Sequence, residues 1–168
     1  MRTFYDLIVL TRSRKHVPPQ PLKWFQRLVA SMGKDVCIRV AFKENRPVAG
    51  LLTMNYGKVL YYKYGGSDAM FHHLGAIPLL FWETIQAAKS AGMEELDLGR
   101  SDIADHGLIR FKERLGAHSV RLTRWRSPVD TVSSSLEPLK VRVMKSICAC
   151  LPNQMLILAG RLMYRHVG

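Results

Sequence analysis

Residues 96–117, LDLGRSDIADHGLIRFKERLGA, place a strand pattern, a turn and an amphipathic helix pattern in direct succession. Leucines flank Asp97 at the spacing of a strand that we expect over 94–99, so Asp97 should face away from them. A helix is predicted near 106–115 and a further strand near 118–126. This succession indicates a crossover connection onto a mixed sheet.

The predicted helix carries one charge on its apolar face. At about 100° per residue, Lys112 falls on the face formed by Leu108, Ile109, Phe111 and Leu115. Lys is rarely buried without a partner, so this position is unusual. Two interpretations stay open. Lys112 stabilises an oxyanion formed when an amine attacks an activated carbonyl, or its stem packs on the core while its ammonium reaches solvent or a carboxylate such as Asp97.

Upstream of this stretch, helical and strand periodicities predict helices on either side of a hairpin region. VPPQP at 17–21 separates the first two helices, and Gly33 ends the second. The predicted ranges are 2–14 for the first helix, 36–43, 47–55 and 58–64 for three antiparallel strands, and 76–91 for a third long helix. The fold class is therefore α/β (α+β), with a mixed, mostly antiparallel sheet flanked by helices.

After Pro128 the composition changes. DTVSSSLEP is typical of a linker, and helical patterns follow at 136–150 and 153–165. We therefore expect one domain over 1–128, and a linker with extra C-terminal helices over 129–168. The last helix is basic and amphipathic, which suits packing on the domain and peripheral contact with an anionic membrane alike.

Composition limits the function classes. The 168 residues suffice for one core, and the formal net charge of +12 favours anionic partners such as tRNA, CoA phosphates or acidic lipids. Three cysteines without framework spacing indicate a reducing cytoplasm, where the protein could also lie at the inner face of the membrane. Cys148 and Cys150 lie two apart on a predicted helix, so we expect no metal site.

Two motifs together resemble a known family. LDLGRSD at 96–102 followed by GLIRFKERLGA at 107–117 is similar to the paired signature of FemAB-like acyltransferases of the GNAT superfamily, and PVAGLLTMNYGKVLYYKYGGS at 47–67 resembles their central hairpin. The resemblance implies a GNAT fold without its first and last strands, and a functional role for Lys112. The tail resembles members associated with exopolysaccharide and PEP-CTERM sorting systems.

The resemblance also implies partners and donors. FemAB-like proteins contain two GNAT units in tandem, so we expect this chain to be the C-terminal unit, with a second GNAT half or a homodimer as partner. FHHLGAIP at 71–78 departs from the glycine motif that binds acetyl-CoA in relatives, although Gly75 permits close backbone approach. The donor co-substrate is therefore expected to be aminoacyl-tRNA or acyl-CoA, with no permanently bound cofactor.

The candidate catalytic residues are Lys112 and Asp97. Asp97 could orient Lys112, accept a proton from the amine, or only satisfy backbone donors at the strand end. Candidate binding residues for donor or substrate are Arg100, Phe111, Tyr64, His72, His73 and Gly75. The expected function is transfer of an aminoacyl or acyl group to an amine or hydroxyl of a cell-envelope or polysaccharide precursor. The alternative is a non-catalytic GNAT-shaped half that binds a partner subunit, tRNA or an anionic membrane.

Overall fold

A four-stranded sheet in the order β1-β2-β3-β4 forms the centre of the computed structural model, which describes residues 1–123, 125, 148 and 152–164. β1 to β3 are antiparallel neighbours, whereas β4 runs parallel to β3. The strands are β1 (Val36–Lys43), β2 (Arg46–Tyr56), β3 (Val59–Ser67) and β4 (Glu95–Asp97). The helices are α1 (Arg2–Arg14), α2 (Leu22–Met32), η1 (Gly33–Asp35), η2 (Ala69–Leu74), α3 (Ala76–Ser90), α4 (His106–Arg114) and α6 (Asn153–Met163). The expected fold class is confirmed.

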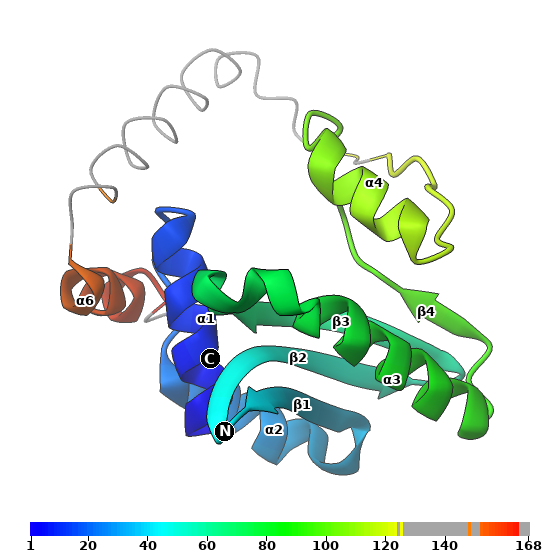
Figure 1. The fold of residues 1–168 in the computed structure, drawn as a ribbon, viewed down its shortest axis with the longest axis horizontal. Coiled ribbons are helices and arrows are strands. Elements are labelled where there is room, and N and C mark those ends of the chain that lie inside the picture. Colours follow the sequence, from blue (N-terminus) through cyan, green and yellow to red (C-terminus); the bar gives the residue numbers. More distant parts are fainter. Residues whose placement is uncertain (124, 126–147, 149–151, 165–168) are drawn as a thin grey trace.

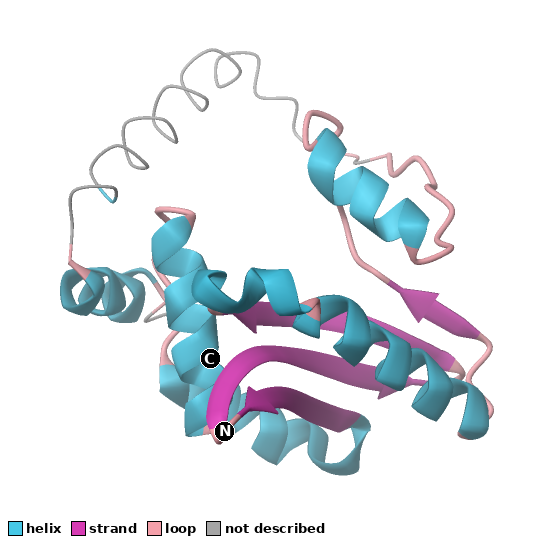
Figure 2. Cartoon of the chain, in the orientation of Figure 1, coloured by secondary structure: helices cyan, strands magenta, loops and turns pink. Residues whose placement is uncertain are grey.

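Helices cover both faces of the sheet, as Figure 2 shows. α1 packs on β2 and β3, and α3 packs on β1 and β2 from the other side. Successive residues of β2 point to opposite faces, so Leu51 joins the apolar cluster under α3 while Leu52 joins the cluster under α1 and α2. The protein therefore has two apolar cores, one on each face of the sheet.

Two glycines let α1 lie unusually close to the sheet. Gly50 and Gly66 are register partners on neighbouring strands. A Cβ atom at Gly66 would lie 2.6 Å from the carbonyl carbon of Leu7 and 2.7 Å from the amide nitrogen of Ile8. A Cβ atom at Gly50 would lie 2.9 Å from the ring of Phe4. The backbone of α1 thus occupies the space of a side chain at Gly66, which fixes the position of α1 along β3.

The structure differs from the sequence prediction around β4. β3 extends to Ser67 and β4 spans three residues, and the strand predicted near 118–126 is wrong where the structure describes it, since residues 118–123 and 125 form no strand. Val120 and Leu122 alternate as in a strand, but they are 82% and 70% exposed and pack against no neighbouring strand. A strand needs a neighbour for its backbone groups, and β4 ends before it could supply one. The helix predicted at 136–150 lies outside the described residues, apart from Cys148.

α6 lies beside α1, at the left of Figure 1. Its Gly160 approaches the 17–21 segment so closely that a Cβ atom there would lie 2.0 Å from the carbonyl oxygen of Pro19. Leu156 is buried, whereas Met155, Leu158 and Leu162 are more than half exposed. Among the described helices, none combines the length and apolar character that a membrane span requires.

Replacement of Gly66 by alanine tests the α1–β3 contact. Because the new Cβ would meet backbone atoms that cannot rotate away, we expect Gly66→Ala to lower the free energy of unfolding by about 1–3 kcal/mol or more in urea titrations. Gly107→Ala is the matched control, since its Cβ would approach only an Asp105 oxygen at 3.8 Å. That control should be neutral or gain up to about 1 kcal/mol. Equal effects of the two substitutions would contradict the close-contact account.

Candidate active site

A cavity of about 380 Å³ lies where β4 departs from β3. The two strands pair only as far as Tyr61 and Asp97, after which the chain turns away toward α4 (Figure 1). Residues 62–67 of β3 therefore have no paired strand on this edge in the described part of the chain. The lining comes from both faces of the sheet: α1 and its C-cap (Thr11, Arg14, Lys15), β2 and β3 (Val48, Ala49, Tyr62, Gly65, Gly66, Ser67), η2 and α3 (Phe71, His72, Ala76, Ile77, Pro78, Phe81), and the β4–α4 side (Leu98, Leu108, Phe111, Lys112).

The last turn of α1 is bonded to the end of β3. Thr11 Oγ1 accepts a hydrogen bond from the Ser67 amide at 2.8 Å and lies 3.2 Å from its carbonyl oxygen, to which it donates. Arg14 donates to the same carbonyl at 3.2 Å and to Ser67 Oγ at 3.5 Å. Ser67 Oγ also lies 2.9 Å from His72 Nε2. These contacts hold polar groups from α1, β3 and η2 together on one wall of the cavity.

Lys112 lies on the opposite wall. Its ammonium donates to the carbonyl oxygens of Gly99 at 2.6 Å and Arg100 at 3.3 Å. The face of α4 predicted from the sequence is confirmed, because its members are partly buried while the other residues of the helix are exposed. Phe111 on this face packs edge-on against Phe81 of α3, with ring centroids 5.8 Å apart. α4 is thereby fixed over the cavity with its one inward-facing charge.

The environment changes the proton affinity of two lining residues. Partial burial lowers the pKa of Lys112 below its usual value, and the attraction of Asp97 and Asp105 opposes this shift without cancelling it. Burial raises the pKa of Tyr62 above its usual value, against the attraction of Arg12. Tyr62 is therefore a neutral phenol at physiological pH, and Lys112 loses its proton at a lower pH than an ordinary lysine.

The sequence-predicted residues divide into two groups. Lys112, Phe111 and His72 line the cavity, and Gly75 precedes the lining residue Ala76 as the left-handed N-cap of α3. Asp97 Oδ1 accepts the Gly99 amide at 2.6 Å, which is the backbone role considered among its alternatives. It forms no ion pair with Lys112 within the described residues.

Three predicted binding residues do not line the cavity. Arg100 contributes its carbonyl oxygen to Lys112, while its side chain is exposed. His73 is exposed and lies outside the lining. Tyr64 packs against Trp24 and Phe25 in the core under α2, on the other face of the sheet. We therefore leave these side chains out of the proposed site.

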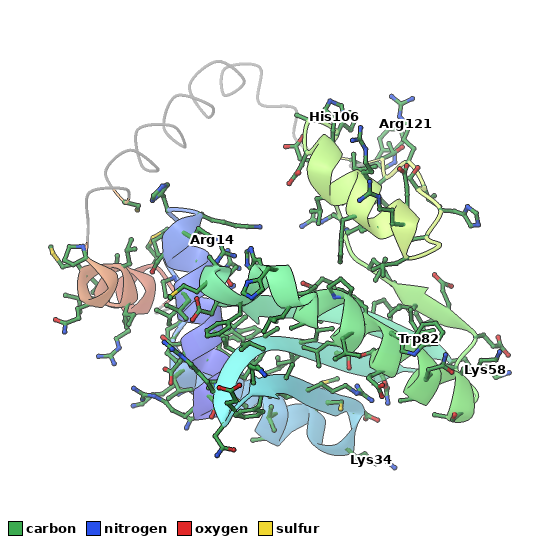
Figure 3. All side chains as sticks on the ribbon, in the orientation of Figure 1. Arg14, Lys34, Lys58, Trp82, His106 and Arg121 are labelled. Carbon is green, nitrogen blue, oxygen red and sulfur yellow. The ribbon has the colours of Figure 1, made fainter. Side chains whose placement is uncertain are left out.

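The contribution of α1 to the cavity was not predicted from the sequence. Thr11, Arg14 and Lys15 recur at helical spacing and line the cavity, as do Tyr62 and Ser67 of β3. Figure 3 labels Arg14 at the end of α1 that borders the cavity. The basic run TRSRK was visible at 11–15, but it resembles the ordinary cationic end of a helix. Only the contact of α1 with Ser67 shows which of its basic side chains face the site.

A family model described as an acetyltransferase (GNAT) domain matches residues 1–113. The chain belongs to the GNAT acetyltransferase domain family. The matched range includes both walls of the cavity, from Thr11 to Lys112. Among curated proteins, no sequence matches the chain.

Solved structures of several acetyltransferases share the fold. An aminoglycoside acetyltransferase, meta-AAC0020, from an uncultured soil metagenomic sample is 20% identical, with a TM-score of 0.59 over 75% of this chain and 88% of that chain. The ribosomal-protein-S18-alanine N-acetyltransferase from Escherichia coli is 16% identical, with a TM-score of 0.59 over 73% and 74%. The aminoglycoside acetyltransferase AAC(6')-Iy in complex with a CoA bisubstrate analogue is 12% identical, with a TM-score of 0.58 over 74% and 92%. At these identities the likeness establishes the fold and not the acceptor.

Substitution of Thr11 tests the bond between α1 and β3. Thr11→Val keeps the shape of the side chain but leaves the amide of the buried Ser67 without an acceptor, so the free energy of unfolding should fall by about 1–3 kcal/mol. Thr11→Ser keeps the hydroxyl and should lose much less. Chemical denaturation of both variants checks this, and an equal loss in the two variants would contradict the hydrogen-bond account.

Proposed function

We propose that this GNAT domain is an acyltransferase that moves an acyl group from an acyl-CoA to an amine or hydroxyl acceptor. The observation that carries the proposal is the cavity at the unpaired edge of β3, with Lys112 fixed on one wall and His72 on the other. Family membership supports acyl-CoA over aminoacyl-tRNA as the donor, and a structural neighbour binds a CoA bisubstrate analogue. The motifs at 96–102 and 107–117 extend the proposal to FemAB-like acceptors, namely cell-envelope or polysaccharide precursors.

The residues present fit an acyl thioester arm. Residues 62–67 of β3 end in Gly65, Gly66 and Ser67; β2 pairs with one edge of this stretch, and the edge beside the cavity has no paired strand in the described part of the chain. An extended ligand with amide groups can bind such an edge in the way that a peptide adds to a sheet. Leu98, Phe111 and Ile77 provide apolar walls for the acyl chain.

Transfer requires alignment, charge stabilisation and removal of one proton. An acyl-CoA would supply an activated carbonyl carbon, so the bond to the acceptor nitrogen or oxygen forms as the carbon–sulfur bond breaks. Lys112 is placed to stabilise negative charge on the carbonyl oxygen, because its ammonium is already oriented by two backbone carbonyls. His72 is placed to accept the proton of the acceptor and return it to the leaving thiolate. No nucleophile on the protein is needed.

Lys112 variants test this role. Lys112→Ala should lower kcat for acetyl transfer by about 100-fold or more, measured at a temperature well below the thermal midpoint of the variant so that the loss of its bonds to Gly99 and Arg100 does not unfold the protein. Arg114→Ala, on the exposed face of the same helix, is the matched control and should keep full turnover. Unchanged turnover in Lys112→Ala would remove Lys112 from the mechanism.

The pH profile separates a charge role from a packing role. Because the pKa of Lys112 is lowered, its positive charge is lost as pH rises through a value below that of an ordinary lysine. Activity should therefore fall on the alkaline side earlier than free lysine would titrate. Lys112→Arg stays charged throughout, so any activity it retains should persist to higher pH. An alkaline limb that is identical in the two proteins would assign Lys112 to packing alone.

The donor is tested by equilibrium binding. Acetyl-CoA should bind the chain, and charged tRNA should bind more weakly and lose affinity steeply as salt increases. Binding of charged tRNA that persists at high salt, together with no binding of acetyl-CoA, would overturn the choice of donor. Binding of both without any transfer would favour the non-catalytic alternative.

A further inference from the structure

The charged side chains that line the cavity are all basic. Arg14, Lys15, Lys112 and His72 are the basic lining residues, and no carboxylate is among the lining residues. Asp97 and Asp105 act on Lys112 from outside the lining. On the wall formed by the end of α1, the ion pairs within the described residues involve neither Arg14 nor Lys15.

Arg14 is held ready to bind a ligand. Its two terminal nitrogens bond to the carbonyl and hydroxyl oxygens of Ser67, and Ser67 is buried. A guanidinium has five N–H donors in a rigid fork, so these contacts orient the group and leave donors available. Lys15 follows on the same rim of the cavity and is exposed. An oriented guanidinium beside an exposed ammonium suits a carboxylate or phosphate.

Attraction to the helix dipole does not account for this arrangement. Basic side chains in the last turn stabilise a helix wherever they point around its axis. Arg12 supplies the internal comparison, because it lies in the same turn, bonds to Gln20 at 3.4 Å and does not line the cavity. The dipole therefore explains a basic helix end but not the presence of two cations on the cavity side.

The position of this pair favours the acceptor. The cavity is lined from both faces of the sheet, with α3 on one face and α1 on the other. A donor bound along β3 with its phosphates at the start of α3 would use the face of the sheet that α3 covers, whereas the end of α1 lies on the other face and is free to contact a second substrate. We propose that Arg14 and Lys15 form a subsite for a carboxylate or phosphate group carried by the acceptor. The proposal rests on the proposed function, and it separates this chain from aminoglycoside acetyltransferases, because aminoglycosides are polycations that this wall would repel.

Four small amines of one length test the subsite. 2-Aminoethyl phosphate, β-alanine, ethanolamine and ethylenediamine share an amine two carbons from a phosphate, carboxylate, hydroxyl or second amine. We expect at least one of the two compounds with an anionic group to bind at least tenfold more tightly than ethanolamine, with ethylenediamine weakest, in calorimetric titrations with and without saturating CoA. The tighter of the two identifies phosphate or carboxylate as the group recognised. Equal binding of ethanolamine and both of these compounds overturns the subsite.

Charge removal locates the subsite. Arg14→Gln with Lys15→Gln should reduce anion binding to the level of ethanolamine, whereas Arg12→Gln should leave the tenfold preference intact. Lys15→Gln alone provides a fallback if the double variant folds poorly, because no described contact depends on its ammonium, and it should weaken anion binding at least threefold. An anion preference that survives in the double variant, or in Lys15→Gln where only that variant folds, overturns the assignment.

Donor binding in the same variants shows whether Arg14 and Lys15 bind the phosphates of CoA or the anionic group of the acceptor. Acetyl-CoA should bind the double variant within twofold of its affinity for the wild type. A loss of tenfold or more would assign both cations to the CoA phosphates and overturn the acceptor subsite. Failure of the wild type to bind acetyl-CoA at all would instead refute the proposed function, and the titrations without CoA would still decide whether the anion subsite exists.

Discussion

The rest of the structure depends on the contact between the backbone of α1 and Gly66. With no side chain at this position, the helix approaches β3 more closely than any other residue would allow. Its last turn then reaches the end of the strand, where Thr11 bonds both polar backbone groups of Ser67. The same contact sets the rotation of α1, so it determines that Arg14 and Lys15 face the cavity while Arg12 does not.

The other wall depends on how the chain leaves the sheet after β4. Asp97 bonds the Gly99 amide, Asp105 caps α4 through the Leu108 amide, and Lys112 bonds the carbonyls of Gly99 and Arg100. These local bonds turn the chain away from β3 and return α4 over the gap. The cavity therefore exists because β3 is longer than β4 and because polar contacts hold the β4–α4 connection away from the edge of β3. A longer β4 would close the same edge with backbone hydrogen bonds.

The sequence predicted features that local periodicity determines. The inward face of α4 and the place of Lys112 on it follow from the helical repeat alone. The bounds of α1 and β1 were predicted correctly for the same reason. The strand near 118–126 was wrong because an alternating pattern forms a strand only beside a partner, and none of the described strands reaches it. Tyr62 and Tyr64 lie on opposite faces of the sheet although they are two residues apart, because a bulge between Leu52 and Thr53 shifts the register of β2 and β3.

The residues of α1 were missed for a different physical reason. A helix shows its apolar face in its sequence, but its position along a sheet depends on close contacts such as that at Gly66, which have no local signature. The same contrast between backbone frame and side-chain placement applies to the acceptors that proteins of this fold bind. GNAT structures that are 12–20% identical share the backbone frame with this chain, and the unpaired edge of β3 is a backbone feature. The end of α1 adds side-chain charge to that edge, so it is where chains of one fold can differ most in the acceptors they admit.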